Sequence, residues 1–176
     1  SSAASDVYKR QILKPAIDTR DSATEVTSRI GLRHEANTVD ESIDILEFFK
    51  WAQTQRDIHC VFVDEAQFLT AEHVLQLCKI VDLYDVPVMA YGLRTDFRGE
   101  LFEGSKALLS VADKLVELKG VCHCGRKATM VARIDENGNA ITDGEVVELG
   151  GEDKYVSLCR KHWCELVGAY DEAKNV

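Results

Sequence analysis

Apolar residues follow two different spacings along the first two thirds of the chain. Two nearly continuous apolar runs of strand length, Ile58–Val63 and Val86–Tyr91, are typical of strands buried in a parallel sheet. Between them, apolar residues recur at helical spacing and predict a helix over Thr70–Tyr84 with Thr70 as its N-cap. Its predicted inner face consists of Val74, Leu77, Cys78 and Val81. The succession of strand, helix and strand predicts an α/β domain.

Weaker patterns flank this unit. Ile12–Ile17 predicts a short strand, although Pro15 would then have to lie at a sheet edge or a bulge. The segment Thr38–Glu41 fits a capping box and predicts a helix that continues to about Gln53. Ser105–Leu115 predicts a further short helix.

From Leu118 onward the pattern changes to short runs typical of strands. These runs are Ala128–Ile134, Glu145–Leu149 and Tyr155–Leu158. Asn137-Gly138 predicts a tight hairpin and Gly150-Gly151 another turn. We therefore expect a small second module rich in β-structure.

These changes of pattern predict four segments. We expect a disordered or non-native leader at residues 1–11, an α/β domain at residues 12–118, the second module at residues 119–167 and a tail at residues 168–176. The leader has no basic region followed by an apolar one, so it is not a secretory signal.

Composition restricts the partners of the chain. With 176 residues and 45% hydrophobic content, the chain can bury a proper core. No apolar run approaches the roughly 20 residues that cross a bilayer, so we expect no membrane partner and a cytoplasmic location. The net charge of −9 argues against a nucleic-acid partner, because phosphate backbones favour clustered Lys and Arg. Small anionic ligands remain compatible with this charge.

Four candidate zinc ligands lie in two tight pairs. The pairs are Cys122 with Cys124, and Cys159 with His162. Thiolates and a neutral imidazole can close a tetrahedron around Zn²⁺ and leave no open position, which is typical of a structural site. Cys164 or His123 could take the place of His162. The alternative of a disulfide framework is disfavoured, because nothing else indicates an oxidising compartment.

The two remaining cysteines, Cys60 and Cys78, lie in apolar runs and are expected to be buried thiols.

Acidic residues follow the first apolar strand. Asp64 and Glu65 come directly after Val63, where parallel sheets bind ligands, and resemble a Walker B pair that orients Mg²⁺ and supplies a base. The alternative is that Asp64 only caps the loop that follows the strand and has no role in binding Mg²⁺. Asp18 and Arg20, which follow the first short strand, could hold Mg²⁺ and a phosphate, or could form a surface ion pair. The polar segment Tyr91–Glu100 follows the other strand and could equally be an ordinary loop.

In chain order these segments resemble the type II thymidine kinases of bacterial type. The resemblance extends from about Ile12 to Glu165. It rests on Asp18-Thr-Arg20, Ser28–Leu32, Val63–Phe68, Tyr91–Glu100, Cys122-x-Cys124-Gly, Gly150-Gly151 with Tyr155, and Cys159–His162. It implies a parallel sheet of the P-loop NTPase, RecA-like type and a zinc-binding lasso domain.

The resemblance also implies a reaction, the transfer of the ATP γ-phosphate to the 5′-hydroxyl of thymidine or deoxyuridine. Glu65 matches the proton acceptor. The residues that match contacts with ATP and Mg²⁺ are Asp64, Gln67, Asp18 and Arg20. Those that match nucleoside contacts are Phe68, Leu93, Phe97, Val146, Val147, Glu148, Leu149, Gly150 and Tyr155. A homotetramer and feedback inhibition by the triphosphate end-product are implied by the family alone.

One family element has no counterpart in the sequence. ATP-binding members carry a Gly-x-x-x-x-Gly-Lys-Ser/Thr loop before the strand that ends near Asp18, and only 17 residues precede Asp18 here. We therefore expect an N-terminally truncated domain that does not turn over ATP and lacks a central strand, which would leave Cys60–Val63 less covered.

Two other functions deserve comparison. A non-catalytic, zinc-stapled nucleoside-binding module is the main alternative. A nucleic-acid-dependent ATPase would explain Asp64–Gln67, but it would need a phosphate loop and a basic groove.

Overall fold

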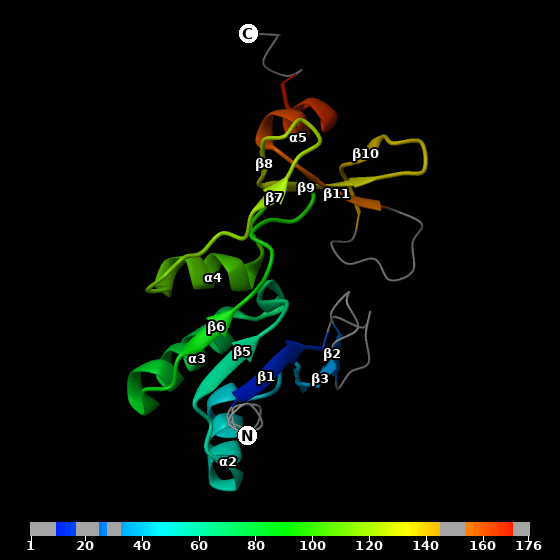
Figure 1. The fold of residues 1–176 in the computed structure, drawn as a ribbon. Helices are drawn as coiled ribbons and strands as arrows, with labels where there is room; N and C mark the ends of the chain where they lie inside the picture. Colours follow the sequence, from blue (N-terminus) through cyan, green and yellow to red (C-terminus); the bar gives the residue numbers. More distant parts are fainter. Residues whose placement is uncertain (1–9, 17–24, 28–32, 145–153, 171–176) are drawn as a thin grey trace. The chain divides into compact units, whose positions relative to one another are not determined.

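The computed structural model describes residues 10–16, 25–27, 33–144 and 154–170 (Figure 1). These residues fall into two compact units. The first lies within Ser1–Arg94 and Phe102–Asp113, and the second within Thr95–Leu101 and Lys114–Val176. The loop Thr95–Leu101 therefore folds with the second unit, although its neighbours in sequence on both sides belong to the first.

A four-stranded sheet forms the centre of the first unit. Its order is β4 (Asn37–Val39), β1 (Arg10–Pro15), β5 (Cys60–Val63) and β6 (Val88–Ala90). All three pairings are parallel, which confirms the prediction of a parallel sheet. The carboxyl ends of the four strands therefore lie at one edge, and Asp64 follows β5 at that edge. A separate hairpin joins β2 (Glu25–Thr27) and β3 (Arg33–Glu35).

Two helices, α2 (Ile45–Gln55) and α3 (Ala71–Tyr84), bury their apolar sides with the sheet in one core. The inner face of α3 differs from the predicted one, because Cys78 and Val81 are only half-buried and Ile80 is fully buried. Thr70 caps α3 as predicted, by accepting a hydrogen bond from the His73 backbone N–H at 3.2 Å.

The strand β5 alternates between buried and half-buried residues. Val61 and Val63 are 1% and 0% exposed, whereas Cys60 and Phe62 on the opposite face are half-buried. Since β1 and β6 pair with β5 on both sides, the expectation of a poorly covered strand is wrong for Val61 and Val63. Cys60 and Cys78 are half-buried rather than buried, and burial raises the pKa of each thiol.

Two predictions near the N-terminus are wrong. Pro15 does not lie at an edge strand, because β1 is an interior strand. It is tolerated as the last residue of β1, where the next N–H, that of Ala16, donates to the Val39 carbonyl at 2.8 Å. The strand also begins at Arg10, two residues inside the expected leader.

The expected capping box at Thr38–Glu41 does not start a helix, because Thr38 belongs to β4. Instead, Asp44 caps α2 by accepting from the Glu47 N–H at 2.9 Å. Packing explains the later start. The first N–H of α2, on Ile45, donates to the buried Gln76 side chain of α3 at 2.8 Å, so tertiary contact selects this start.

A short 3-10 turn, η1 (Ala66–Phe68), and the helix α4 (Glu103–Val111) complete the first unit. The helix starts two residues before and ends four residues before the predicted Ser105–Leu115. Close packing sets its start, because a Cβ atom built on Gly104 would lie 2.4 Å from the Ala66 carbonyl oxygen and 2.8 Å from that of Leu69. Only glycine permits this approach of α4 to η1.

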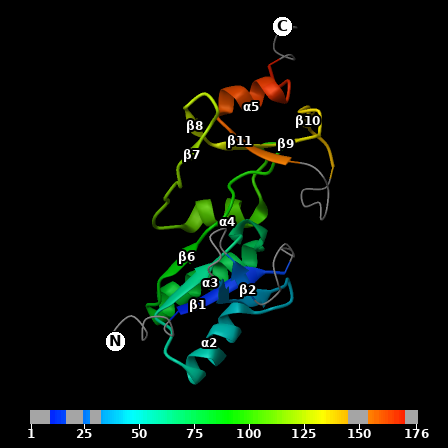
Figure 2. The same cartoon turned by 45° about the vertical axis from the view of Figure 1, so that its right-hand side comes forward.

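The second unit contains an antiparallel sheet in the order β10 (Ala140–Ile141), β9 (Met130–Ile134) and β11 (Lys154–Leu158). Figure 2 shows β9 and β11 side by side. The hairpin predicted at Asn137-Gly138 is confirmed, with Gly138 at φ +84° between β9 and β10. The predicted strand at Glu145–Leu149 and the turn at Gly150-Gly151 lie outside the described residues.

The cysteine pairs lie on smaller elements of the second unit. A hairpin of β7 (Gly120–Val121) and β8 (Lys127–Ala128) carries the first pair, and Cys159 precedes the helix α5 (Arg160–Leu166). Apolar periodicity over seven residues is too short to identify such a helix.

The packing of α4 against η1 gives a stability prediction. Gly104→Ala should lower the free energy of unfolding by roughly 1–3 kcal/mol, because overpacking outweighs the helix preference of alanine, at most about 1 kcal/mol. Urea denaturation measures this change. Ser110→Ala, at the exposed end of the same helix, is the control and should stay within about 0.5 kcal/mol of the unmodified chain. A Gly104→Ala protein of unchanged stability would contradict the close approach.

Candidate functional site

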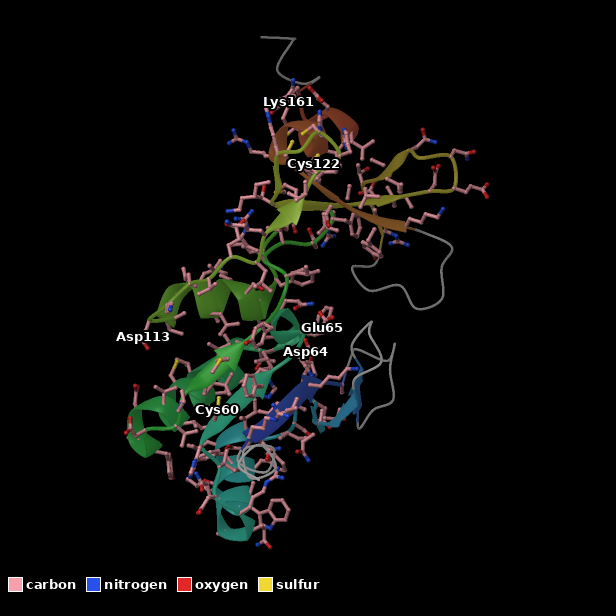
Figure 3. The ribbon with its side chains drawn as sticks, in the orientation of Figure 1. Cys60, Asp64, Glu65, Asp113, Cys122 and Lys161 are labelled. Atoms are coloured by element: carbon pink, nitrogen blue, oxygen red, sulfur yellow. The ribbon has the colours of Figure 1, made fainter. Side chains whose placement is uncertain are left out.

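A sharp turn places two carboxylates at the carboxyl edge of the sheet. β5 ends at Val63, and Figure 3 shows Asp64 and Glu65 directly beyond it. Asp64 stays in register with the sheet, because its N–H donates to the Leu13 carbonyl at 3.0 Å. Glu65 adopts the left-handed conformation, with φ +48° and ψ +39°. Such a conformation is uncommon outside glycine, so surrounding contacts must hold it.

Those contacts come from the segment that follows β6. The Ala66 N–H donates to the Tyr91 carbonyl at 2.8 Å, and the Tyr91 N–H donates to the Val63 carbonyl at 2.8 Å. The Asp64 side chain accepts from the Glu65 N–H at 3.0 Å, which ties the two acidic residues together. The turn is therefore fixed by hydrogen bonds on both sides.

Gln67 holds the Glu65 side chain. Its amide Nε2 donates to Glu65 Oε2 at 2.5 Å, and its Oε1 accepts from the Leu93 N–H at 3.1 Å. Gln67 is only 2% exposed. A Cβ atom on Gly92 would lie 2.5 Å from Gln67 Oε1, so glycine is required next to this amide. The buried amide thus fixes one oxygen of the carboxylate.

The predicted nucleoside contacts fall in both units. Phe68 lies in η1, half-buried, with its ring 5.6 Å from that of Phe102 in an edge-to-face arrangement. Leu93 is half-exposed, and its carbonyl accepts from the Ser105 hydroxyl at 2.5 Å. Phe97 lies in the second unit, where its ring is 2% exposed.

Asp18, Arg20 and the segment 146–150 lie outside the described residues. Tyr155 is described, lies on β11 and is about half exposed.

The four candidate zinc ligands come together in the second unit. The ligand atoms of Cys122, Cys124, Cys159 and His162 all lie within 4.8 Å of one another. The hairpin β7–β8 supplies the first two, and the start of α5 supplies the others. The Gly125 N–H donates to the Cys122 carbonyl at 2.8 Å and closes the tight turn, with Gly125 at φ +81°.

The spacing of these atoms fits a tetrahedral zinc ion. Zn–S bonds of about 2.3 Å and Zn–N bonds of about 2.0–2.1 Å give tetrahedral edges of about 3.8 Å between sulfurs and about 3.6 Å between sulfur and nitrogen. The Sγ atoms of Cys124 and Cys159 are 3.9 Å apart, and Cys122 Sγ lies 3.3 Å from His162 Nδ1. The cluster is therefore compatible with a structural zinc site.

The environment favours a thiolate at Cys122. Burial opposes its ionisation, but donation from the N–H groups of Cys124 and Cys159 and from the His162 ring outweighs burial and lowers the pKa of Cys122 to about 5. The Arg126 N–H favours the thiolate of Cys124, but burial and the neighbouring thiols outweigh it and raise the pKa of Cys124. A thiolate is the form that binds metal.

The sequence left His123 and Cys164 as alternatives to His162. His123 stacks on the His162 ring, with centroids 4.3 Å apart, and its Nδ1 lies 3.6 Å from Cys122 Sγ. Neither His123 nor Cys164 belongs to the group of four within the described residues. The geometry therefore favours His162.

An open cavity of about 800 Å³ lies beside this cluster within the second unit. Its lining includes Tyr155, His123, His162 and Glu165.

Among the described residues, none of the helices has the length and apolar character that a membrane crossing requires.

Comparison with known proteins identifies the family. A sequence model of thymidine kinases matches residues 2–163. The chain belongs to the thymidine kinase family. The thymidine kinase of Enterobacteria phage T4 is 66% identical over 155 residues, which cover 88% of this chain and 80% of that protein.

Bacterial thymidine kinases match over a similar range. That of Vibrio cholerae is 55% identical over 157 residues, covering 89% of this chain and 82% of the relative. That of Agrobacterium fabrum is 53% identical over 154 residues, covering 88% and 80%. The resemblance to a bacterial-type thymidine kinase family is confirmed, and family membership makes the chain a kinase by class.

Two features of this thymidine kinase family member were not foreseen. The sequence matched Gln67 to contacts with ATP and Mg²⁺, which stays a prediction; the structure adds that its side-chain amide donates to Glu65 and accepts from the Leu93 N–H. The contacts of Trp163, whose indole N–H donates to the carbonyls of Phe97 and Val131, were also not foreseen. A glutamine two residues after an acidic pair and a tryptophan next to a ligand histidine were the available signals, but neither specifies a partner.

The metal cluster gives a direct prediction. Cys122→Ser should lose bound zinc and destabilise the second unit, because one corner of the tetrahedron is removed. Zinc content of the purified protein, measured by atomic emission, tests this. Cys78→Ser is the control, since Cys78 lies on α3 in the first unit, and it should keep its zinc. Equal zinc content in both variants would disprove the assigned cluster.

Proposed function

We propose that this chain carries the nucleoside-binding and proton-accepting parts of a kinase that transfers the ATP γ-phosphoryl group to the 5′-hydroxyl of thymidine or deoxyuridine. The observation that carries the proposal is the Glu65 carboxylate at the carboxyl end of β5, held by the buried Gln67 amide. Family membership supports the reaction class and the nucleoside substrate.

In the proposed step, Glu65 accepts the proton of the 5′-hydroxyl. The 5′-oxygen then forms a bond to the γ-phosphorus, while the bond between that phosphorus and the β–γ bridging oxygen breaks and ADP leaves with the electron pair. Phosphoryl transfer depends on positioning and charge neutralisation more than on covalent help. The Gln67 amide holds this carboxylate by donating to its Oε2.

Asp64 is the proposed orienting residue for Mg²⁺, together with Asp18 and Arg20 for the metal and phosphates. When bound with ATP, Mg²⁺ would neutralise charge that develops on the phosphates. Asp64 is held by sheet register through its N–H and by the Glu65 N–H through its side chain, so its position is set before any ligand binds.

The nucleoside is proposed to contact Phe68, Leu93, Phe97 and Tyr155 and the backbone of 146–150. The proposed role of the zinc cluster is structural: it joins the ends of the 125–158 segment, which includes the proposed nucleoside contacts at 146–150 and Tyr155. A cytoplasmic location and a homotetramer remain expectations from the family resemblance.

The 176 residues contain no Gly-x-x-x-x-Gly-Lys-Ser/Thr pattern. We therefore propose that this polypeptide by itself binds the nucleoside without turning over ATP, which would make it in practice a zinc-stapled nucleoside-binding module. The family match leaves no support for a nucleic-acid-dependent ATPase.

The proposal predicts binding without turnover for the 176-residue polypeptide. Isothermal titration should detect thymidine binding, whereas incubation with ATP and thymidine should yield no ADP or thymidine monophosphate. Measured turnover of ATP would overturn this part of the proposal. Absence of thymidine binding would overturn the nucleoside-binding part.

The role of Glu65 is tested in a chimera. Residues 1–9, which precede β1, are replaced by the N-terminal segment of the phage T4 thymidine kinase. The chimera should phosphorylate thymidine, and Glu65→Gln should lower its kcat by roughly 10²–10⁴-fold with little change in KM, because it removes a general base. The control is Glu136→Gln in the exposed β9–β10 hairpin, which should leave kcat unchanged. A Glu65→Gln chimera with full kcat would exclude Glu65 as the base.

A further inference from the structure

The loop Thr95–Leu101 is a self-contained turn. Thr95 and Leu101 form an antiparallel bridge, the Asp96 N–H donates to the Glu100 carbonyl at 2.9 Å, and the Gly99 N–H donates to the Asp96 carbonyl at 3.2 Å. The Asp96 carboxylate, 5% exposed, accepts from the N–H groups of Arg98 and Glu100 at 2.9 Å each. Because its bonds are internal, the loop behaves as one piece.

Trp163 attaches this piece to the second unit. Its indole N–H is shared between the Phe97 carbonyl at 3.2 Å and the Val131 carbonyl of β9 at 3.0 Å. The same indole lies against the loop backbone at Gly99, where a Cβ atom would be 2.9 Å from Trp163 Cη2 and 3.1 Å from Cζ2. One side chain therefore contacts the loop both by a hydrogen bond and by surface packing.

The zinc cluster fixes Trp163 in turn. Trp163 directly follows the candidate ligand His162, and its backbone N–H donates to the carbonyl of the candidate ligand Cys159 at 3.0 Å. The helix α5 that carries it has seven residues. Isolated helices shorter than about 12–15 residues are marginal in water, so the two ligands at the start of α5 supply the constraint that its length does not.

Phe97 is held by the same elements. Its ring is 2% exposed and lies 5.6 Å from the Arg133 guanidinium of β9 and 5.7 Å from that of Arg98. Arg133 lies two residues beyond Val131, the other acceptor of the Trp163 N–H. The carbonyl and the ring of Phe97 are thus both held against β9.

We propose that Trp163 is a positioning residue that transmits the order of the zinc cluster to the loop Thr95–Leu101 and so sets the position of Phe97. The effect on nucleoside binding rests on the proposed function, in which Phe97 contacts the base. The zinc ion would then constrain two segments, the residues between its two ligand pairs and the loop Thr95–Leu101 outside that span.

Hydrogen exchange of the intact, zinc-loaded chain tests the transmission. Trp163→Phe keeps an aromatic ring and removes the N–H, so the amides of Arg98, Gly99 and Glu100 should exchange about tenfold faster while the zinc content stays unchanged. Removing zinc from the unmodified chain with a chelator should accelerate the same amides. The control is Trp51→Phe on the exposed side of α2, which should change neither quantity.

A second variant tests the contact from the loop side. Gly99→Ala places a methyl group against the indole at a residue with φ +86°. Gly138→Ala is matched to it, because φ is +84° and nothing lies within 4 Å of the new Cβ. Faster loop exchange in Gly99→Ala but not in Gly138→Ala, with zinc retained in both, supports the proposal even if Trp163→Phe does not fold.

Thymidine titration separates this inference from the proposed function. Trp163→Phe should weaken thymidine binding about tenfold, whereas Trp51→Phe should not.

Loop exchange that is unchanged in Trp163→Phe and after zinc removal overturns the transmission. Loss of zinc from Trp163→Phe also overturns it, since Trp163 would then act on the cluster itself. An accelerated loop with normal thymidine binding overturns the nucleoside part, and an unmodified chain that binds no thymidine overturns the proposed function while leaving the exchange result valid.

Discussion

The left-handed turn at Glu65 is the constraint on which the candidate site of the first unit depends. The turn follows the end of β5 directly, and Asp64 before it stays in register with the sheet through its N–H. The Tyr91 backbone and the Gln67 side chain hold it, and glycines at 92 and 104 allow the neighbouring segments to approach. The position of the Glu65 carboxylate and the packing of α4 against η1 therefore both depend on the short segment that follows β5.

The second unit solves a different problem. Among its described elements, β7, β8 and β10 have only two residues each and α5 has seven, and its buried cluster is small, so it lacks the core that would stabilise it alone. Bringing four ligand atoms within 4.8 Å of one another allows one ion to supply the missing constraint. Trp163, which follows His162 in the sequence, extends that constraint to Phe97, because its indole N–H donates to the Phe97 carbonyl.

Much of this could be predicted from local pattern. The parallel strands, the Thr70 cap and the hairpin at Gly138 depend on periodicity and turn chemistry, which are properties of short segments. The start of α2 could not be predicted in this way, because both Thr38 and Asp44 are suitable N-cap residues. The hydrogen bond from the Ile45 N–H to the Gln76 side chain selects the later start. The prediction that Pro15 lies at a sheet edge or a bulge failed for a related reason. Pro15 is the last residue of β1, so an interior strand tolerates its missing N–H.

By itself, the sequence determined the α/β class, the acidic pair after β5, the four candidate metal ligands and, through its motifs in order, the thymidine kinase family. These properties depend on residue type and spacing along the chain. Only the tertiary structure decided that Gln67 binds Glu65, that His162 rather than His123 completes the cluster and that Trp163 holds Phe97. Those choices depend on which groups of distant segments meet within hydrogen-bond distance, and spacing along one chain does not specify such meetings.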